Sequence, residues 1–158
     1  VYTTSRRVSG IAQEKKMLYI AYGSNLDVTQ MRHRCPNAIP LRGMMLPNFK
    51  LVFRGVADIT EEPDAEVPVG LFEITHDCET ALDRYEGFPR LYSKIHFEMD
   101  EKLMMAYVMN QRDIRPPSSG YYAGIRRGYF NFGLDVSYLE QARRHSYSHQ
   151  TFGDLLPD

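Results

Sequence analysis

Leu18-Tyr19-Ile20-Ala21-Tyr22-Gly23-Ser24-Asn25-Leu26 is the stretch of this sequence that decides the fold. Its first four residues are an apolar run typical of a buried strand, and Asp27 and Gln30, at capping-box spacing, predict a helix that begins at residues 25–27 and runs toward Cys35. Gly23, between the predicted strand and the predicted helix, lets the chain turn sharply. The first N–H groups of a helix have no partners inside the helix. The junction is therefore a candidate anion-binding site, although the pattern alone more often marks an ordinary capped loop.

Length and composition limit the classes of function. A chain of 158 residues suits one domain, and 19 basic against 20 acidic residues give a net charge of −1, which predicts no nucleic-acid partner. No window approaches the roughly 20 apolar residues that cross a bilayer, so no membrane partner is expected. Cys35 and Cys78 stand far apart in no metal-like or redox-like spacing. They predict buried, reduced thiols in a cytoplasmic protein.

The N-terminal tract differs in character from the rest of the chain. Residues 1–16 are polar and lack apolar periodicity, which indicates a flexible leader or a cloning remnant, with Met17 as a plausible natural start. Residues 17–158 show no linker and no repeat, and they predict a single domain.

The remaining pattern predicts more strands than helices. Residues 44–53 suggest a hairpin that turns at Pro47-Asn48, and the acidic residues 61–66 suggest a turn or mobile loop. Further strands are expected at residues 56–59, 67–74, 92–99 and 102–109, with helices from Asp77 to Gly87, at 121–129 and at 136–145, and a tail of uncertain order at 146–158. Most links between strands are too short for parallel crossovers. The predicted class is α+β, a small, mixed, mostly antiparallel β-barrel with flanking helices.

Glu86 is the carboxylate that the pattern singles out. It ends the predicted helix before Gly87, where the unsatisfied carbonyl groups disfavour a negative charge, and apolar cover from Phe88, Tyr85 or Tyr92 would further raise its pKa. A carboxyl group with a raised pKa is a better proton acceptor at neutral pH. A solvated glutamate at a helix end is the more common case for an isolated residue of this kind.

The aromatic residues form the third signal, because the chain has 11 tyrosines and no tryptophan. Most are expected in the core, but Tyr92, Tyr107 and Tyr121 stand at positions from which hydroxyl groups could converge on a small polar ligand. Other chemistry is poorly supported. The five histidines show no zinc-ligand spacing, Ser24 is not in a nucleophile elbow, and the first loop lacks the glycine pattern and the lysine of nucleotide-binding turns.

In order and spacing, these residues resemble the γ-glutamylcyclotransferase-like family. The similarity spans residues 17–139. It rests on the loop at 22–26, Met31 with Arg34-Cys35-Pro36, the segment 82–87 with Tyr92, and Pro116-Pro117-Ser118 with Tyr121 ahead of Gly128-Tyr129. It implies an enzyme that releases an amine from a γ-glutamyl amide as the glutamyl group closes to 5-oxoproline. The substrate's own amine is then the nucleophile, so no cofactor and no metal are expected.

The resemblance also implies roles for individual residues. Glu86 would be the catalytic proton shuttle. The substrate-binding residues would be Tyr22, Gly23, Ser24, Asn25, Leu26, Tyr92, Tyr107 and Tyr121. The loop would hold the glutamyl carboxylate or the developing oxyanion through its N–H groups.

Several alternatives stay open from sequence. The identity of the γ-glutamyl substrate is not determined, and a non-catalytic binding or regulatory module on the same fold is the second hypothesis. An amidase or acyltransferase that uses Glu86 to activate an external nucleophile is the third. The aromatic residues 129–132 are either core or a seat for a second subunit, so a homodimer is a further hypothesis.

Overall fold

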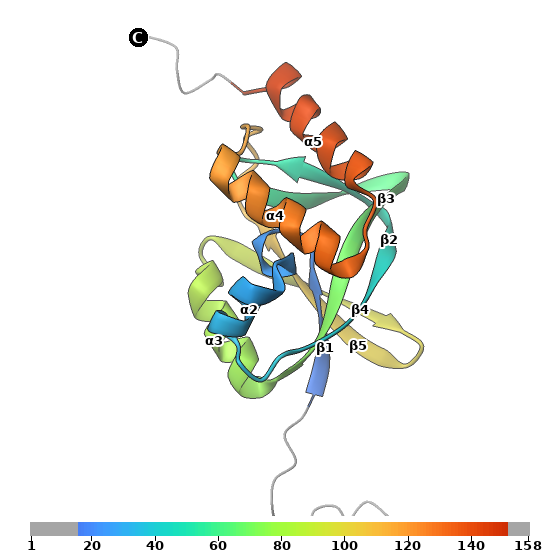
Figure 1. Cartoon of the computed structure of the whole chain (residues 1–158), viewed down its shortest axis with the longest axis vertical. Helices are drawn as coiled ribbons and strands as arrows, with labels where there is room; N and C mark the ends of the chain where they lie inside the picture. The colour runs from blue at the N-terminus through green and yellow to red at the C-terminus, as the bar shows by residue number, and fades with distance from the viewer. Residues whose placement is uncertain (1–15, 152–158) are drawn as a thin grey trace, which may run out of the picture.

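The structure is a computed structural model that describes residues 16–151 (Figure 1). The elements in chain order are β1 (Lys16–Ala21), η1 (Ser24–Leu26), α2 (Val28–Arg34), β2 (Ile39–Phe53), β3 (Ala57–Thr75), α3 (His76–Glu86), β4 (Tyr92–Met99), β5 (Lys102–Met109), α4 (Ser119–Phe132) and α5 (Val136–Ser148). The predicted leader lies outside the described residues except for Lys16, which already pairs with Thr75 in the sheet. The predicted tail begins within α5, and residues 152–158 of it lie outside the described residues.

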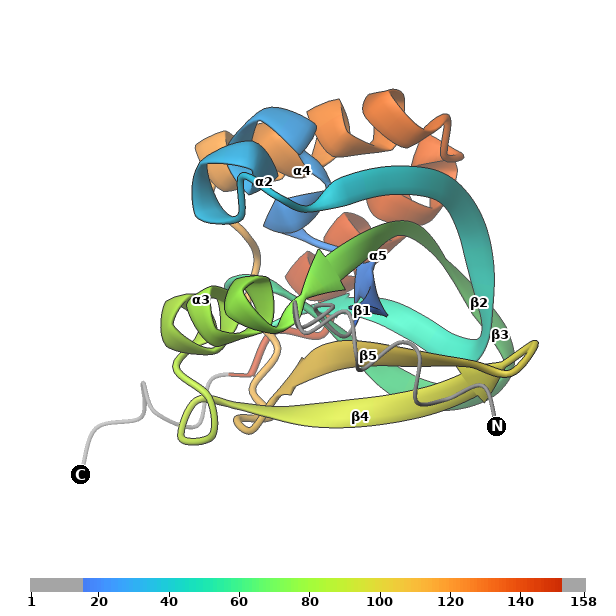
Figure 2. The same ribbon diagram turned by 90° about the horizontal axis from the view of Figure 1, so that it is seen from below.

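The five strands form one mixed sheet in the order β2-β3-β1-β5-β4. β1 pairs antiparallel with β3 and parallel with β5, and the other two pairings are antiparallel. The predicted α+β class with a mixed, mostly antiparallel sheet is therefore confirmed. The sheet curls, as Figure 2 shows, but it is not a closed barrel, since among residues 16–151 no ladder joins the edge strands β2 and β4. Those edges meet through side chains instead, with the rings of Phe49 and Phe97 5.7 Å apart.

β2 and β3 make one long hairpin that corrects two predictions. The expected turn at Pro47-Asn48 is an irregularity within β2, where the register to β3 shifts and Asn48 has a φ of 66°. The expected acidic loop at residues 61–66 is part of β3. Asp64, with a φ of 70°, donates its backbone N–H to the Asn48 side chain at 3.2 Å. The turn-forming residues therefore produce an irregularity within paired strands, in which Asn48 stands opposite residues 62–65 between the pairs Pro47–Glu66 and Phe49–Glu61.

The second hairpin and α3 follow their sequence patterns closely. β4 and β5 pair along their whole length, and both residues of the connecting turn, Asp100 and Glu101, have positive φ angles, as a tight two-residue turn of this kind requires. α3 ends at Glu86 because Gly87 adopts a φ of 76° and returns its N–H to the carbonyl oxygens of Asp83 and Arg84. Glu86 is thereby held at the helix terminus, as predicted.

α4 packs against the loop that follows β1. Gly128 is buried, and a Cβ atom added there would lie 2.7 Å from the backbone nitrogen of Asp27 and closer still to Leu26. Leu26 is fully buried between this helix and the sheet, where a Cβ at Gly70 would also meet it. The aromatic residues 129–132 are divided: Tyr129 is buried, whereas Phe130 is 86% exposed.

The two cysteines are paired, which corrects the prediction of two separate reduced thiols. Cys35 caps the C-terminus of α2, Cys78 lies in the first turn of α3, and the two form a disulfide with Cα atoms 5.3 Å apart. The spacing of the cysteines along the chain did not predict the disulfide, because folding brings together two residues that are 43 positions apart. The cytoplasmic expectation rested on separate thiols and loses that support. Among residues 16–151, no helix is long and apolar enough to cross a bilayer.

Candidate active site

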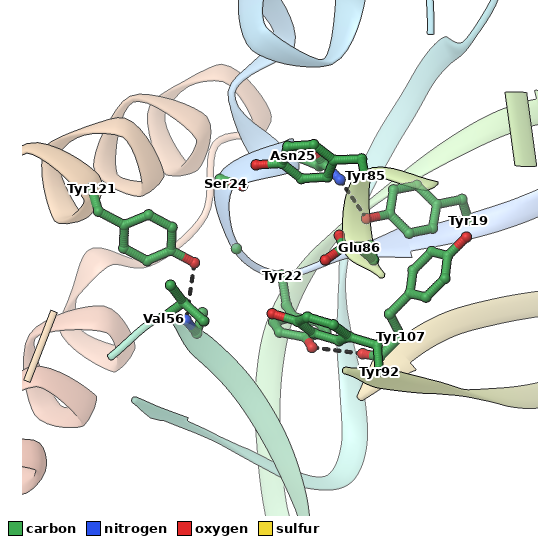
Figure 3. A pocket seen from close by; sticks show the side chains of 12 residues that line it. Tyr19, Tyr22, Ser24, Asn25, Val56, Tyr85, Glu86, Tyr92, Tyr107 and Tyr121 are labelled. Carbon is green, nitrogen blue, oxygen red and sulfur yellow. Dashed lines mark hydrogen bonds between the residues drawn. The ribbon is translucent and has the colours of Figure 1, made fainter. Parts of the chain in front are cut away.

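A small cavity lies where the loop after β1, the end of α3 and the strand ends meet, and Figure 3 shows its side chains. Its volume is about 80 Å³. The lining consists of Tyr19, Tyr22, Gly23, Ser24, Asn25, Val56, Ala57, Tyr85, Glu86, Tyr92, Tyr107 and Tyr121. All predicted site residues except Leu26 therefore face one space. We call this space the inner cavity.

The loop is held by its own backbone and leaves two amides free. Gly23 and Ser24 accept hydrogen bonds from the N–H groups of Leu26 and Asp27 at 3.0 and 3.1 Å. The N–H groups of Ser24 and Asn25 have no acceptor within the described residues, and both residues line the inner cavity. A Cβ at position 23 would stand 3.1 Å from Ala57, so the close approach of the chain here favours glycine. The loop thus offers two backbone donors to a ligand.

The Asn25 side chain is occupied by the protein itself. It is 3% exposed, donates to the Tyr19 hydroxyl at 2.9 Å and accepts a hydrogen bond from Arg34. Arg34 comes from the end of α2, and its guanidinium stacks on the Tyr85 ring at 3.9 Å. Asn25 therefore orients the loop with its side chain and leaves only its backbone to a ligand. Leu26, which does not line the cavity, anchors the same loop to the core.

Among the described residues, Glu86 carries the single carboxyl group in the lining of the inner cavity, and Figure 3 shows it among the tyrosine rings. Burial raises its pKa from 4.5 to about 7, and the nearby positive charge of Arg34 opposes that shift. Its carboxylate has no hydrogen-bond or ion-pair partner within residues 16–151. At neutral pH the group therefore exists in both protonation states, which suits a residue that must take up a proton and give it back.

Two of the tyrosine hydroxyl groups are free to donate. The Tyr121 hydroxyl accepts the backbone N–H of Ala57 at 2.9 Å, so its own proton has no acceptor among the described residues. The Tyr92 hydroxyl makes no hydrogen bond within that part of the chain. Burial raises the pKa of both groups above the ordinary tyrosine value, so both stay protonated at neutral pH. They come from β4 and α4, on separate sides of the inner cavity.

The hydroxyl groups of Tyr22 and Tyr107 are used inside the protein. Tyr22 donates to the backbone carbonyl of Tyr107 at 2.6 Å, and Tyr107 donates to the carboxylate of Asp83 at 2.5 Å. Tyr107 is 2% exposed. Both residues were predicted to bind substrate, and in the structure each presents a ring to the cavity while its polar end is bonded elsewhere.

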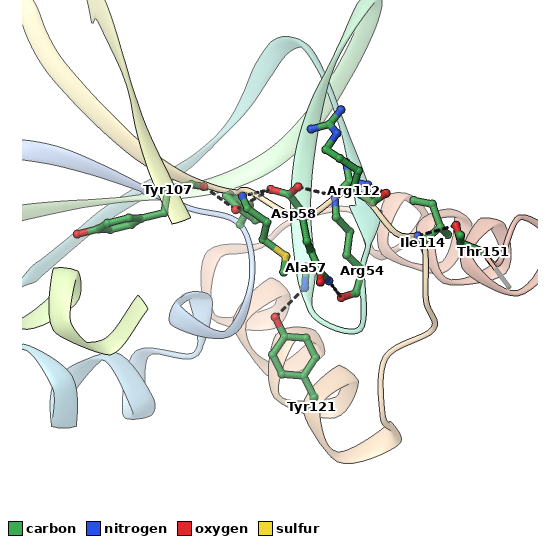
Figure 4. Close-up of polar contacts among 11 residues, drawn as sticks. Arg54, Ala57, Asp58, Tyr107, Arg112, Ile114, Tyr121 and Thr151 are labelled. Atoms are coloured by element: carbon green, nitrogen blue, oxygen red, sulfur yellow. Dashed lines mark hydrogen bonds and ion pairs between the residues drawn. The ribbon is translucent and has the colours of Figure 1, made fainter. Parts of the chain in front are cut away.

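A buried ion pair fixes the back wall of the site (Figure 4). Arg54 contacts Asp58 at 2.6 Å and donates to the carbonyl of Arg112 at 2.7 Å. Asp58 also accepts the backbone N–H of Met109 at 2.9 Å, at the end of β5. These bonds tie the β2–β3 hairpin to the strand that carries Tyr107.

Sequence reasoning missed several residues of the cavity. Tyr19 lies in the first apolar run and has the pattern of a core residue, and Tyr85 has that of a helix-face residue. Val56 belongs to the short connection between β2 and β3, and Ala57 is the first residue of β3. Arg34 was seen only as part of a motif, with no role attached. The signal that could have found Tyr19 is the period of two in β1, which turns alternate side chains to one face of the sheet.

The arrangement supports proton transfer next to a stabilised negative charge. A carboxyl group that titrates near neutrality shares the inner cavity with two backbone N–H groups and two hydroxyl groups that have no acceptor within residues 16–151. No histidine lines this space in the described part of the chain, and residues 16–151 contain no cluster of three His, Cys, Asp or Glu side chains placed to hold a metal ion.

Comparison with known proteins gives a consistent result. The family model described as "Gamma-glutamyl cyclotransferase, AIG2-like" matches residues 19–124. Gamma-glutamylcyclotransferase of Bos taurus is 30% identical over 80% of this chain and 77% of its own length, and that of Homo sapiens is 28% identical over 82% and 79%. A solved gamma-glutamyl cyclotransferase structure superposes with a TM-score of 0.71 at 27% identity, covering 81% of this chain and 86% of that chain.

Proposed function

Because the chain belongs to the gamma-glutamyl cyclotransferase, AIG2-like family, we propose that it cleaves a γ-glutamyl amide by closing the glutamyl group to 5-oxoproline with release of an amine or amino acid. One observation carries the proposal: Glu86, with its pKa near 7, lines the same small cavity as the free N–H groups of Ser24 and Asn25. The reaction needs one proton shuttle and one anion cradle, and in this proposal Glu86 is the shuttle and the two N–H groups are the cradle.

The first step forms the ring. Glu86 takes a proton from the α-ammonium group of the substrate, and the freed amine attacks the γ-carbonyl carbon. The carbonyl oxygen becomes an oxyanion, and in this proposal the N–H groups of Ser24 and Asn25 stabilise it. Enclosure in about 80 Å³ favours the folded conformation of the glutamyl chain, in which the amine and the carbonyl meet.

The second step breaks the amide. The oxyanion re-forms the carbonyl group, the C–N bond to the leaving amine breaks, and the protonated Glu86 delivers its proton to the leaving nitrogen. The ring nitrogen still carries a second proton, which Glu86, again a carboxylate, accepts and passes to the released amine. The products are 5-oxoproline and the amine in its ammonium form, and Glu86 returns to its starting state. Both protons lost by the α-nitrogen reach the leaving nitrogen through Glu86, so no external acid or base is consumed.

The test is a direct assay of product. We expect 5-oxoproline to form when the protein is incubated with a panel of γ-glutamyl amino acids, and we expect Glu86→Gln to lower kcat by about 10²- to 10⁴-fold with the fold intact. Glu62→Gln is the matched control, because Glu62 is exposed on β3 and does not line the inner cavity. A Glu86→Gln protein with wild-type turnover would contradict the mechanism.

The same experiment separates the alternatives. Thermal stabilisation by 5-oxoproline without product formation would indicate a binding module, since a ligand that binds only the native state raises its stability. Release of free glutamate would indicate an amidase. Cofactor independence, a homodimer and a cytoplasmic location belong to the proposal as predictions, and so does the assignment as an acyltransferase- or lyase-type enzyme.

A further inference from the structure

A second, larger space opens directly beside the inner cavity. Its volume is about 660 Å³, and it shares the side chains of Val56, Tyr85, Glu86 and Tyr92 with the inner cavity. We call it the outer groove. The inner cavity, at about 80 Å³, has room only for a small head group, so the rest of any longer ligand must extend past Glu86 into the outer groove. Under the proposed function, the leaving amine occupies this groove.

The outer groove contains a positive charge with no partner. Arg90 lines it, is exposed, and makes no hydrogen bond or ion pair through its guanidinium within residues 16–151. The single carboxylate that residues 16–151 contribute to the lining is Glu86, which must be free to accept a proton under the proposed function. An unpaired guanidinium beside a binding space is suited to a planar anion, because its N–H groups can pair with both oxygens of a carboxylate.

Arg90 stands on a turn that is fixed to its surroundings. The N–H of Leu91 donates to the carbonyl of Gly87 at 2.8 Å, and the Asn110 side chain donates to the carbonyl of Arg90 at 2.8 Å. The backbone N–H of Asn110 also donates to the carbonyl of Leu91 at 3.0 Å. The backbone of Arg90 is therefore held at a set position relative to Glu86, four residues earlier in the chain.

We propose that Arg90 binds the α-carboxylate of the leaving amino acid and so makes γ-glutamyl amino acids better substrates than γ-glutamyl amines that lack this group. The inference rests on the proposed function. In a γ-glutamyl amino acid, the carboxylate is attached one carbon beyond the amide nitrogen that receives the proton from Glu86. Leu91 and Met109 line the same groove and offer apolar surface to the amino-acid side chain.

Two substrates that differ in one group test the proposal. γ-Glutamylalanine and γ-glutamylethylamide differ only in the carboxylate of the leaving group. The measured quantity is the ratio of kcat/KM for the first to kcat/KM for the second. We expect this ratio to fall by about 10- to 100-fold in Arg90→Gln, mainly through KM for γ-glutamylalanine, because a charge-assisted pair to a carboxylate is lost. Arg90→Lys should recover part of the ratio, since it keeps the charge without the fork.

Arg84→Gln is the matched control, because Arg84 is an exposed arginine at the same end of α3 and lines neither space. The ratio of kcat/KM for γ-glutamylalanine to kcat/KM for γ-glutamylethylamide should be the same in Arg84→Gln as in the wild type. If both substrates are turned over and Arg90→Gln leaves the ratio unchanged, Arg90 does not read the carboxylate and the proposed function stands. If the wild type forms 5-oxoproline from neither substrate, the proposed function fails and this inference fails with it.

Discussion

Glu86 combines burial with a position at the end of α3, and its titration near pH 7 has a direct kinetic consequence. The carboxylate form of the free enzyme must accept the substrate proton, so kcat/KM is expected to rise with pH through an apparent pKa of about 7. The check is the pH profile of kcat/KM between pH 5 and pH 9, measured for one γ-glutamyl amino acid. A flat profile from pH 6 to pH 8 would show that another group takes the proton.

The same pKa shift predicts how stability depends on pH. The folded protein binds the Glu86 proton more tightly than the unfolded chain does, so the stability that this carboxyl contributes is fully present below pH 4.5 and is lost as pH rises through about 7. Glu86→Gln has no charge to bury. We expect the free energy of unfolding of Glu86→Gln to equal that of the wild type at pH 4 and to be higher at pH 8, by at most about 3 kcal/mol.

The measurement is urea unfolding of the wild type and of Glu86→Gln at both pH values. Glu62→Gln again serves as the control, since it makes the same substitution at an exposed position outside the inner cavity. An equal stability of Glu86→Gln and wild type at pH 8 would mean that the carboxyl is solvated in the folded protein.

At the scale of elements, the contact between α4 and the loop after β1 holds the loop that is proposed to bind the oxyanion. Gly128 faces Leu26 so closely that a Cβ would overlap its backbone, whereas Gly120, in the first turn of the same helix, has nothing within 4 Å of an added Cβ. The loop carries Ser24 and Asn25, so displacement of α4 would move their N–H groups relative to Glu86.

We expect Gly128→Ala to lower the free energy of unfolding by about 1–3 kcal/mol or more, because the backbone must shift to relieve the overlap. It should also reduce kcat/KM, since a small displacement of catalytic groups is costly. Gly120→Ala should stay within about 1 kcal/mol of the wild type, on the stabilising side, through its better helix propensity. Chemical unfolding and the 5-oxoproline assay check both variants. Wild-type activity in a folded Gly128→Ala protein would show that α4 does not position the loop.

At the scale of the whole molecule, the disulfide between Cys35 and Cys78 joins the end of α2 to the first turn of α3. α2 ends in Arg34, which holds Asn25, and α3 ends in Glu86. The bond closes a separation of 43 residues, and in the chain-entropy view it restricts the unfolded state.

We expect reduction of this bond to lower the free energy of unfolding by about 2–4 kcal/mol. Unfolding of the wild type should be measured with and without dithiothreitol. The double variant Cys35→Ala, Cys78→Ala should not respond to the reductant. If the wild type responded no more than the double variant, the cysteines would not form the bond in solution.

The sequence was a good guide wherever local backbone chemistry decides the outcome. β1, the turn at Gly23, the end of α3 at Glu86 and the hairpin from Tyr92 to Met109 follow from apolar periodicity, glycine positions and turn residues. The same local signals failed at Pro47-Asn48 and at residues 61–66, where the strands stay paired on both sides of an irregularity that leaves Asn48 and residues 62–65 without register partners. Pairing is a long-range contact, and a local signal does not report it.

The amino-acid sequence by itself determined the class of the fold, the loop, the terminal glutamate of α3 and the supply of tyrosines. Only the tertiary structure decided that Tyr92 and Tyr121 keep free hydroxyl groups while Tyr22 and Tyr107 do not, that Cys35 meets Cys78, and that Arg90 faces the groove beside Glu86. The physical reason is that a side chain's chemistry belongs to its residue type, whereas its partners and its solvation depend on segments that meet only when the sheet curls and the helices pack.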